Sequence, residues 1–184
     1  MWVLVLALAI IISAPDDWRQ ESFPFPLAFA PTIAYEGTEH VRFNPGWEQF
    51  SSDAGFSYVF VWDVKAKPVT PEDLEDHLET YFNGLMGNVA RGRKLAAEPL
   101  KAAVAVHPMT AVPGWSQGYG AEVRTSNAFS KNEALLLHGE ITQRACGAGR
   151  MQIFFAFSRS PRDRSIWESL RAVRNATTCE APVS

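Results

Sequence analysis

The chain has 184 residues, of which 47% are hydrophobic and 20% charged, and its formal net charge is −3 at pH 7. This length suits one domain with a substantial buried core. The slightly acidic balance leaves no surplus of Lys and Arg to neutralise a row of phosphates. The composition therefore argues against a dedicated nucleic-acid-binding protein.

An apolar run opens the chain at residues 1–12 and is followed by the small residues Ser13 and Ala14. A membrane-spanning helix needs about 20 apolar residues, so this run fits the hydrophobic part of a secretory signal better than a permanent anchor. The alternative is a buried N-terminal strand or helix. We expect residues 1–14 to be a secretory signal segment. Residues 15–184 are then a single exported domain, periplasmic or extracellular, with no permanent membrane span once the leader is removed.

The chain contains two cysteines, Cys146 and Cys179. In an oxidising compartment such a pair tends to close, which predicts a disulfide bond between them. The alternative is two separate buried thiols. A redox site is not indicated, because the sequence has no C-x-x-C motif.

Three extended segments are predicted in the first part of the domain. A proline-spaced segment at 23–31 predicts an extended edge strand or a strap laid over the core by its phenylalanines. Residues 40–43 alternate as a short strand that ends in a Pro-Gly turn before Trp47. Residues 56–64 alternate between an aromatic and a valine face, which predicts a central strand buried on both sides.

A helix is predicted to begin at Pro71, with Thr70 as its N-cap. Apolar residues then recur at helical spacing and are expected to face the core, whereas the acids between them are expected to face water. Gly84 and Gly87 are expected to end the helix. The core-facing residues are Leu74, Leu78, Phe82 and Leu85, and the acids are Glu75, Asp76 and Glu79.

Four more strands are predicted at 102–107, 119–125, 135–143 and 151–158, the last two joined by a short glycine loop. A closing helix is predicted at 161–174, with an apolar stripe toward the core. We therefore expect an α+β domain in which two main helices pack on a single antiparallel-rich sheet.

Residues 114–118 read G-W-S-Q-G and match the G-x-S-x-G pattern of the serine elbow in hydrolases. With Glu133 as the acid and His138 as the base, Ser116 makes a small secreted serine hydrolase the alternative function. However, Pro113 directly precedes the motif, and the residues after it alternate like a strand, whereas an elbow leads into a helix. We interpret the motif as a turn and expect a protein that is not an enzyme.

The four histidines, at positions 40, 77, 107 and 138, are scattered at spacings that metal sites do not favour. The sequence also has no glycine loop of the kind that cradles phosphates. We expect neither a metal nor a cofactor.

Two tryptophans give the positive hint of function. Trp47 and Trp115 each follow a Pro-Gly pair, so both are expected at loop tips. Exposed tryptophan on a rigid turn is typical of the rim of a binding site. The alternative is that each ring folds back as a lid over the core.

The order of these elements resembles that of the Mog1/PsbP-like class of small α/β/α sandwiches. The similarity covers a strand ending in FNPGW, an aromatic strand, the helix TPEDLEDHLETYF, several antiparallel strands and a final helix containing IWESLRAVR. The chain also resembles uncharacterised secreted bacterial proteins with a Pro-rich start and two late cysteines. The resemblance implies an accessory or binding role rather than catalysis and transfers no site residue.

Together these features predict an exported, disulfide-closed binding domain of the cell envelope. Its partner is expected to be a protein or a small ligand, and no oligomeric state is predicted. A purely structural envelope protein is a further alternative. In that case, the two tryptophans would serve stability alone.

Overall fold

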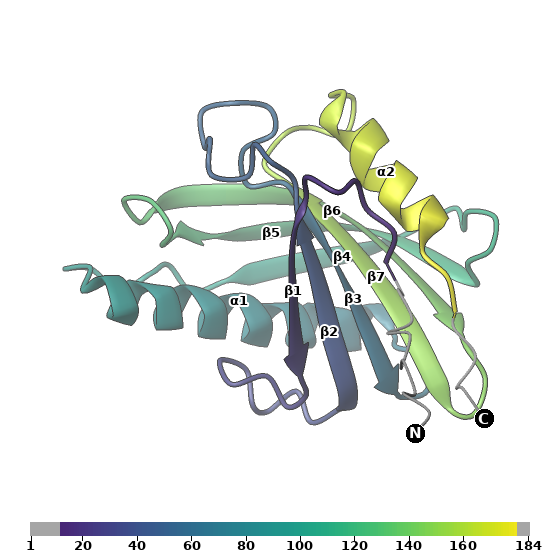
Figure 1. Cartoon of the computed structure of the whole chain (residues 1–184). Helices are drawn as coiled ribbons and strands as arrows, with labels where there is room; N and C mark the ends of the chain where they lie inside the picture. Colours follow the sequence, from purple (N-terminus) through teal and green to yellow (C-terminus); the bar gives the residue numbers. More distant parts are fainter. Residues whose placement is uncertain (1–11, 180–184) are drawn as a thin grey trace, which may run out of the picture.

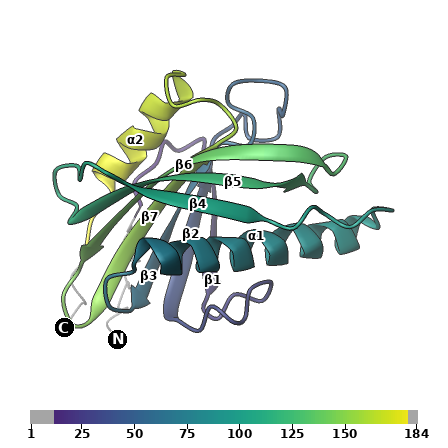
Figure 2. The ribbon, with the colours of Figure 1, turned by 180° about the vertical axis from the view of Figure 1, so that it is seen from behind.

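A computed structural model describes residues 12–179 of the chain. Seven strands form one antiparallel sheet in the order β1-β2-β3-β7-β6-β5-β4, with a helix on each face (Figures 1 and 2). This arrangement confirms the predicted α+β class. The strands are β1 (Arg19–Pro24), β2 (Glu36–Phe43), β3 (Tyr58–Lys65), β4 (Ala103–Met109), β5 (Gln117–Asn127), β6 (Glu133–Ala145) and β7 (Arg150–Ser158), and the helices are α1 (Pro71–Arg93) and α2 (Ile166–Ala176).

The predicted secretory segment, residues 1–14, lies largely outside the described residues. Within residues 12–179, neither helix is long and apolar enough to cross a membrane.

Strand β3 lies inside the sheet and is buried on both faces, as its sequence predicts. Tyr58, Phe60 and Trp62 belong to the hydrophobic core beneath α1, whereas Val59 and Val61 belong to the smaller core beneath α2. Because successive side chains of a strand point to opposite faces, this one segment supplies both cores.

Helix α1 begins where the sequence predicts and ends later than predicted. The Thr70 hydroxyl accepts a hydrogen bond from the backbone N–H of Asp73 at 3.2 Å, which caps the first turn. The helix then continues through both glycines to Arg93, and Lys94 closes it in a left-handed conformation. The prediction that Gly84 and Gly87 end the helix is therefore wrong.

Gly84 is required by packing rather than by helix termination. A Cβ atom at this position would overlap the carbonyl oxygen of Phe29. Phe29 belongs to the segment 25–35 that follows β1, and this segment buries Leu27 and Ile33 against the core. The proline-spaced region is thus an edge strand up to Pro24 and a strap over the core beyond it.

We expect Gly84→Ala to lower the free energy of unfolding by about 1–3 kcal/mol, because the added methyl group forces α1 away from the strap backbone. Urea denaturation measures this loss. Gly92→Ala is the matched control, since a Cβ there meets nothing within 4 Å beyond its own helix backbone and chain neighbours. It should stabilise the helix by about 0.5–1 kcal/mol. Equal effects of the two substitutions would contradict the role given to Gly84.

Helix α1 also covers one of the two edges of the sheet. Strand β4 lies at this edge, where backbone N–H groups have no neighbouring strand. Over three successive turns of α1, one polar side chain per turn accepts a hydrogen bond from the backbone of β4 or of the residue before it, so the expectation that Glu75 and Glu79 face water is wrong. The three pairs are Val106 N–H to Glu75 at 2.7 Å, Val104 N–H to Glu79 at 3.3 Å and Ala102 N–H to Asn83 at 2.8 Å.

Helix α2 packs on the opposite face, against β3 and β7 (Figure 1). Trp167, Leu170 and Val173 form its buried stripe, as predicted, although the helix begins at Ile166 rather than at residue 161. Beyond the helix, a disulfide bond joins Cys179 to Cys146, the residue after β6, which confirms the predicted pair.

Candidate functional site

Neither tryptophan of the predicted binding rim is exposed. Trp47 is 6% exposed and Trp115 is 7% exposed, because both rings fold back onto the protein. Trp115 packs against Phe154 on the α2 face, and the guanidinium group of Arg144 lies 4.1 Å from the centre of its ring. The expectation of exposed loop-tip rings is therefore wrong, and both rings cover the core instead.

The serine of the G-x-S-x-G motif does not sit on an elbow. The backbone N–H of Ser116 bonds to the carbonyl of Gln143 at 2.9 Å, and the next residue begins strand β5 rather than a helix. His138 lies five residues from Gln143 along β6, about 17 Å away at the rise of a strand, and Glu133 lies as far again beyond His138. The structure thus does not bring these three residues together as a catalytic triad.

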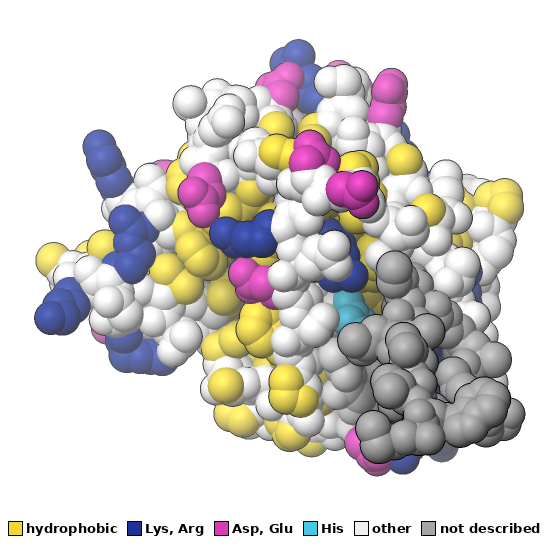
Figure 3. Space-filling model, viewed as in Figure 1, with side chains coloured by type: hydrophobic (Ala, Val, Ile, Leu, Met, Phe, Trp, Pro, Cys, Tyr) yellow, Lys and Arg dark blue, Asp and Glu magenta, His cyan; other side chains and the backbone are white. Residues whose placement is uncertain are grey.

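A cavity of about 290 Å³ lies between the β1–β3 end of the sheet and helix α1. This volume is close to the lower end of the range of about 300–1,000 Å³ that small-molecule sites occupy. Figure 3 shows hydrophobic side chains gathered in a hollow on this side of the molecule, with charged side chains across it. The lining is mainly aromatic and comprises Phe23, Phe29, Phe43, Trp47, Phe56, Tyr58, Tyr81 and Phe129, with Arg19, Glu21, Glu39, Val41, Leu85, Asn88 and Val89.

The cavity exists because α1 does not cover the whole sheet face. The helix lies against β4 and β5, at the far edge from β1. Register places Arg19, Glu21 and Phe23 of β1 opposite the core-facing residues of β2, so these three side chains point to the same face as the core. Two of them are charged and keep the mouth of the cavity polar, while the interior is apolar.

The side chain of Arg19 lies at the mouth of the cavity. Its Nε atom lies 3.3 Å from a carboxylate oxygen of Glu21, and its Nη1 atom lies 3.5 Å from one of Glu48. Its guanidinium carbon lies 4.4 Å from the ring centre of Phe43 and 5.5 Å from that of Trp47. The guanidinium group of Arg19 therefore already covers these two aromatic faces at the entrance of the cavity.

Glu39 is a carboxyl group buried inside the cavity wall. It is 1% exposed and accepts hydrogen bonds from Trp62 Nε1 at 2.7 Å and from the Tyr81 hydroxyl at 3.3 Å. Burial raises the pKa of Glu39 to about 7, and the two hydrogen bonds offset only part of this effect. The carboxyl group is therefore partly protonated near neutral pH.

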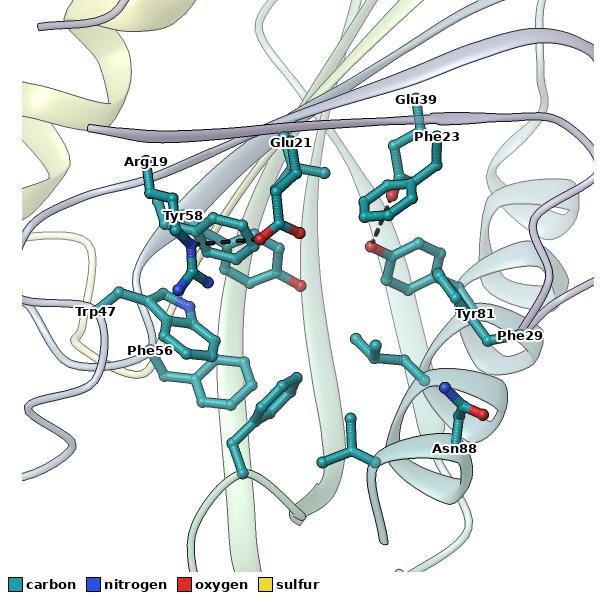
Figure 4. Close-up of a pocket in the computed structure, with 15 residues that line it drawn as sticks. Arg19, Glu21, Phe23, Phe29, Glu39, Trp47, Phe56, Tyr58, Tyr81 and Asn88 are labelled. Atoms are coloured by element: carbon teal, nitrogen blue, oxygen red, sulfur yellow. Dashed lines mark hydrogen bonds and ion pairs between the residues drawn. The ribbon is translucent and has the colours of Figure 1, made fainter. Parts of the chain in front are cut away.

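Two buried hydrogen-bond donors in the same wall have no partner among residues 12–179. They are the hydroxyl of Tyr58, which is 3% exposed, and the indole Nε1–H of Trp47. Figure 4 shows the Tyr58 hydroxyl directed into the space between Trp47 and Phe56 on one side and Tyr81 on the other. Unpaired buried polar groups are rare, and each one costs about 1–3 kcal/mol, so a ligand that accepts these bonds gains that energy.

Of the candidate site residues predicted from the sequence, only Trp47 lies in the cavity wall. Glu39, Tyr58 and Arg19 were missed as site residues. The available signal for Glu39 was its place on one strand face with Val41 and Phe43, where a charge is unexpected. The predicted strand at 40–43 began one residue too late to include it.

The described residues contain no group of three or more His, Cys, Asp or Glu side chains able to hold a metal ion. Comparisons of the chain with protein-family models, with curated proteins and with solved structures gave no match. The resemblance to Mog1/PsbP-like sandwiches therefore stays a prediction.

Proposed function

We propose that the protein is an exported, non-catalytic binding domain that holds a small, largely apolar molecule in the aromatic cavity. The observation that carries this proposal is the buried Tyr58 hydroxyl, which faces an apolar cavity of ligand size without a partner among the described residues. An apolar cavity with a few convergent polar groups is typical of small-molecule sites.

Two features support the exported location. The disulfide bond between Cys146 and Cys179 is of a kind that persists in oxidising compartments. The apolar run at residues 1–12 has the length of a signal segment. A binding domain in the envelope or outside the cell agrees with both.

Ligand binding is tested with N-phenyl-1-naphthylamine, an uncharged probe whose fluorescence rises in apolar sites. We expect saturable one-to-one binding to the full domain. Val89→Trp should weaken it by at least about tenfold, because Val89 lines the cavity on α1 and the larger ring fills the space.

Leu100→Trp is the matched control, since Leu100 is 56% exposed and lies outside the cavity lining. It adds the same ring without filling the site and should leave probe affinity unchanged. If the wild-type domain fails to bind the probe, or if Val89→Trp binds it equally well, the binding proposal is overturned. A structural envelope protein then becomes the better explanation.

A further inference from the structure

Building on the proposed function, we infer the chemical class of the ligand. We propose that the cavity takes an uncharged ring compound with a hydrogen-bond-accepting oxygen, such as an aryl ketone or ester, and that Tyr58 donates to this oxygen.

The aromatic walls favour a ring. Phe56 and Phe129 lie in one aromatic cluster with Trp47, whose ring centre is 5.6 Å from that of Phe56 and 5.0 Å from that of Phe129. On the other side, Phe29 meets Tyr81 edge to face at 5.0 Å. A flat ligand between these walls can make further stacked and edge-to-face contacts, each worth about 0.5–1.5 kcal/mol beyond burial.

The unpaired donors favour an acceptor. The indole Nε1–H of Trp47 can only donate, and the hydroxyl of Tyr58 can donate once its proton turns toward the cavity. Burial raises the pKa of Tyr58 well above its usual value, so this hydroxyl keeps its proton. A ligand oxygen with two lone pairs satisfies one or both groups, whereas a plain hydrocarbon leaves them unpaired.

The charges around the cavity disfavour ions. A cation would meet Arg19, which already covers the faces of Phe43 and Trp47 and is paired with Glu21. An anion would lie beside the carboxyl group of Glu39, with no unpaired cation in the described lining. Burying an ion without a counterion is costly, so an uncharged ligand is preferred.

A series with one common ring system tests this class. Naphthalene, 2-acetylnaphthalene, 2-naphthoate and (2-naphthylmethyl)trimethylammonium are each used to displace N-phenyl-1-naphthylamine at neutral pH. We expect the ketone to bind at least about fivefold more tightly than naphthalene, because it adds a hydrogen bond inside the cavity. Both ions should bind more weakly than the ketone.

The Tyr58→Phe variant tests whether the hydroxyl of Tyr58 donates the hydrogen bond to the ketone oxygen. It should lower ketone affinity by about threefold to tenfold and leave naphthalene affinity unchanged, because only the ketone uses the hydroxyl. Tyr119→Phe is the control, since Tyr119 is buried but bonds to Gln117 outside the cavity. It should change neither affinity.

The outcomes separate the two proposals. If wild-type protein does not bind N-phenyl-1-naphthylamine, the proposed function itself fails. If it binds the probe but the ketone gains nothing over naphthalene, or either ion binds more tightly than the ketone, the binding function stands and the ligand class is wrong. An equal loss for ketone and naphthalene in Tyr58→Phe would also overturn the assigned bond.

Discussion

Replacing Glu39 by Gln should raise the free energy of unfolding above that of wild type when the pH is above 7. The difference between variant and wild type should be about 3 kcal/mol larger there than at pH 4.5. The pKa of Glu39 rises from 4.5 to about 7 on folding, because the carboxyl group is buried between β2 and its hydrogen-bond partners Trp62 and Tyr81. Each unit of such a rise corresponds to about 1.4 kcal/mol. Gln resembles the protonated carboxyl group, so the variant lacks this titration.

The direction of this pH dependence follows from which state of the chain, folded or unfolded, binds the proton of Glu39 more tightly. The folded protein binds it more strongly than the unfolded chain, so the stability from Glu39 is complete below pH 4.5. It is lost as the pH rises through about 7. Gln can still accept from Trp62 and donate to the oxygen of Tyr81, which preserves both contacts that Glu39 makes.

Urea denaturation of both proteins across this pH range measures the effect as a difference, because other groups titrate in the same window. Burial lowers the pKa of His40 and of His77, so each of these gives stability that increases as the pH rises. Their contributions cancel when wild type and variant are compared. Glu21→Gln serves as a control at the half-exposed mouth, and a pH-independent difference for Glu39→Gln would contradict the raised pKa.

Much of the fold could be predicted because its signals are local. The alternating faces of β3 and the Thr70 cap of α1 depend on neighbouring residues and were correct. The end of α1 could not be predicted, since Gly84 serves a contact with Phe29, which lies far away in the sequence. The hydrogen bonds that Glu75 and Glu79 accept from β4 could not be predicted for the same reason, because nothing in the local sequence shows that a helix will lie along a sheet edge.

The site was harder to predict than the fold because it is defined by an uncovered surface. The cavity depends on α1 lying against β4 and β5 and leaving the β1 side of the same face free. Trp47 was found through its turn, but the sequence suggested an exposed ring, whereas the ring closes over the cavity. Glu39 and Tyr58 lie in segments with ordinary strand patterns. Only the register of β2 against β3 shows that both side chains lie on the same face of the sheet.

The double variant Cys146→Ser with Cys179→Ser should lower the free energy of unfolding by about 3–4 kcal/mol. The bond closes a loop with a sequence separation of 33, and opening it restores conformational freedom mainly to the unfolded chain. Urea denaturation measures the loss. Dithiothreitol should lower wild-type stability to the same value and leave the double variant unchanged.

Ligand affinity should survive this loss, because the disulfide and the cavity lie on different parts of the fold. The bond anchors the segment after α2 to the β6–β7 hairpin, where Arg144 and Gln152 also bind the carbonyls of Thr177 and Thr178. The cavity lies at the β1 edge of the sheet, between β1 and α1, whereas β6 and β7 are interior strands. Below the unfolding transition, the double variant should therefore bind N-phenyl-1-naphthylamine with wild-type affinity. If the double variant loses less than about 1 kcal/mol in free energy of unfolding, the hydrogen bonds of Arg144 and Gln152 hold this segment without the disulfide.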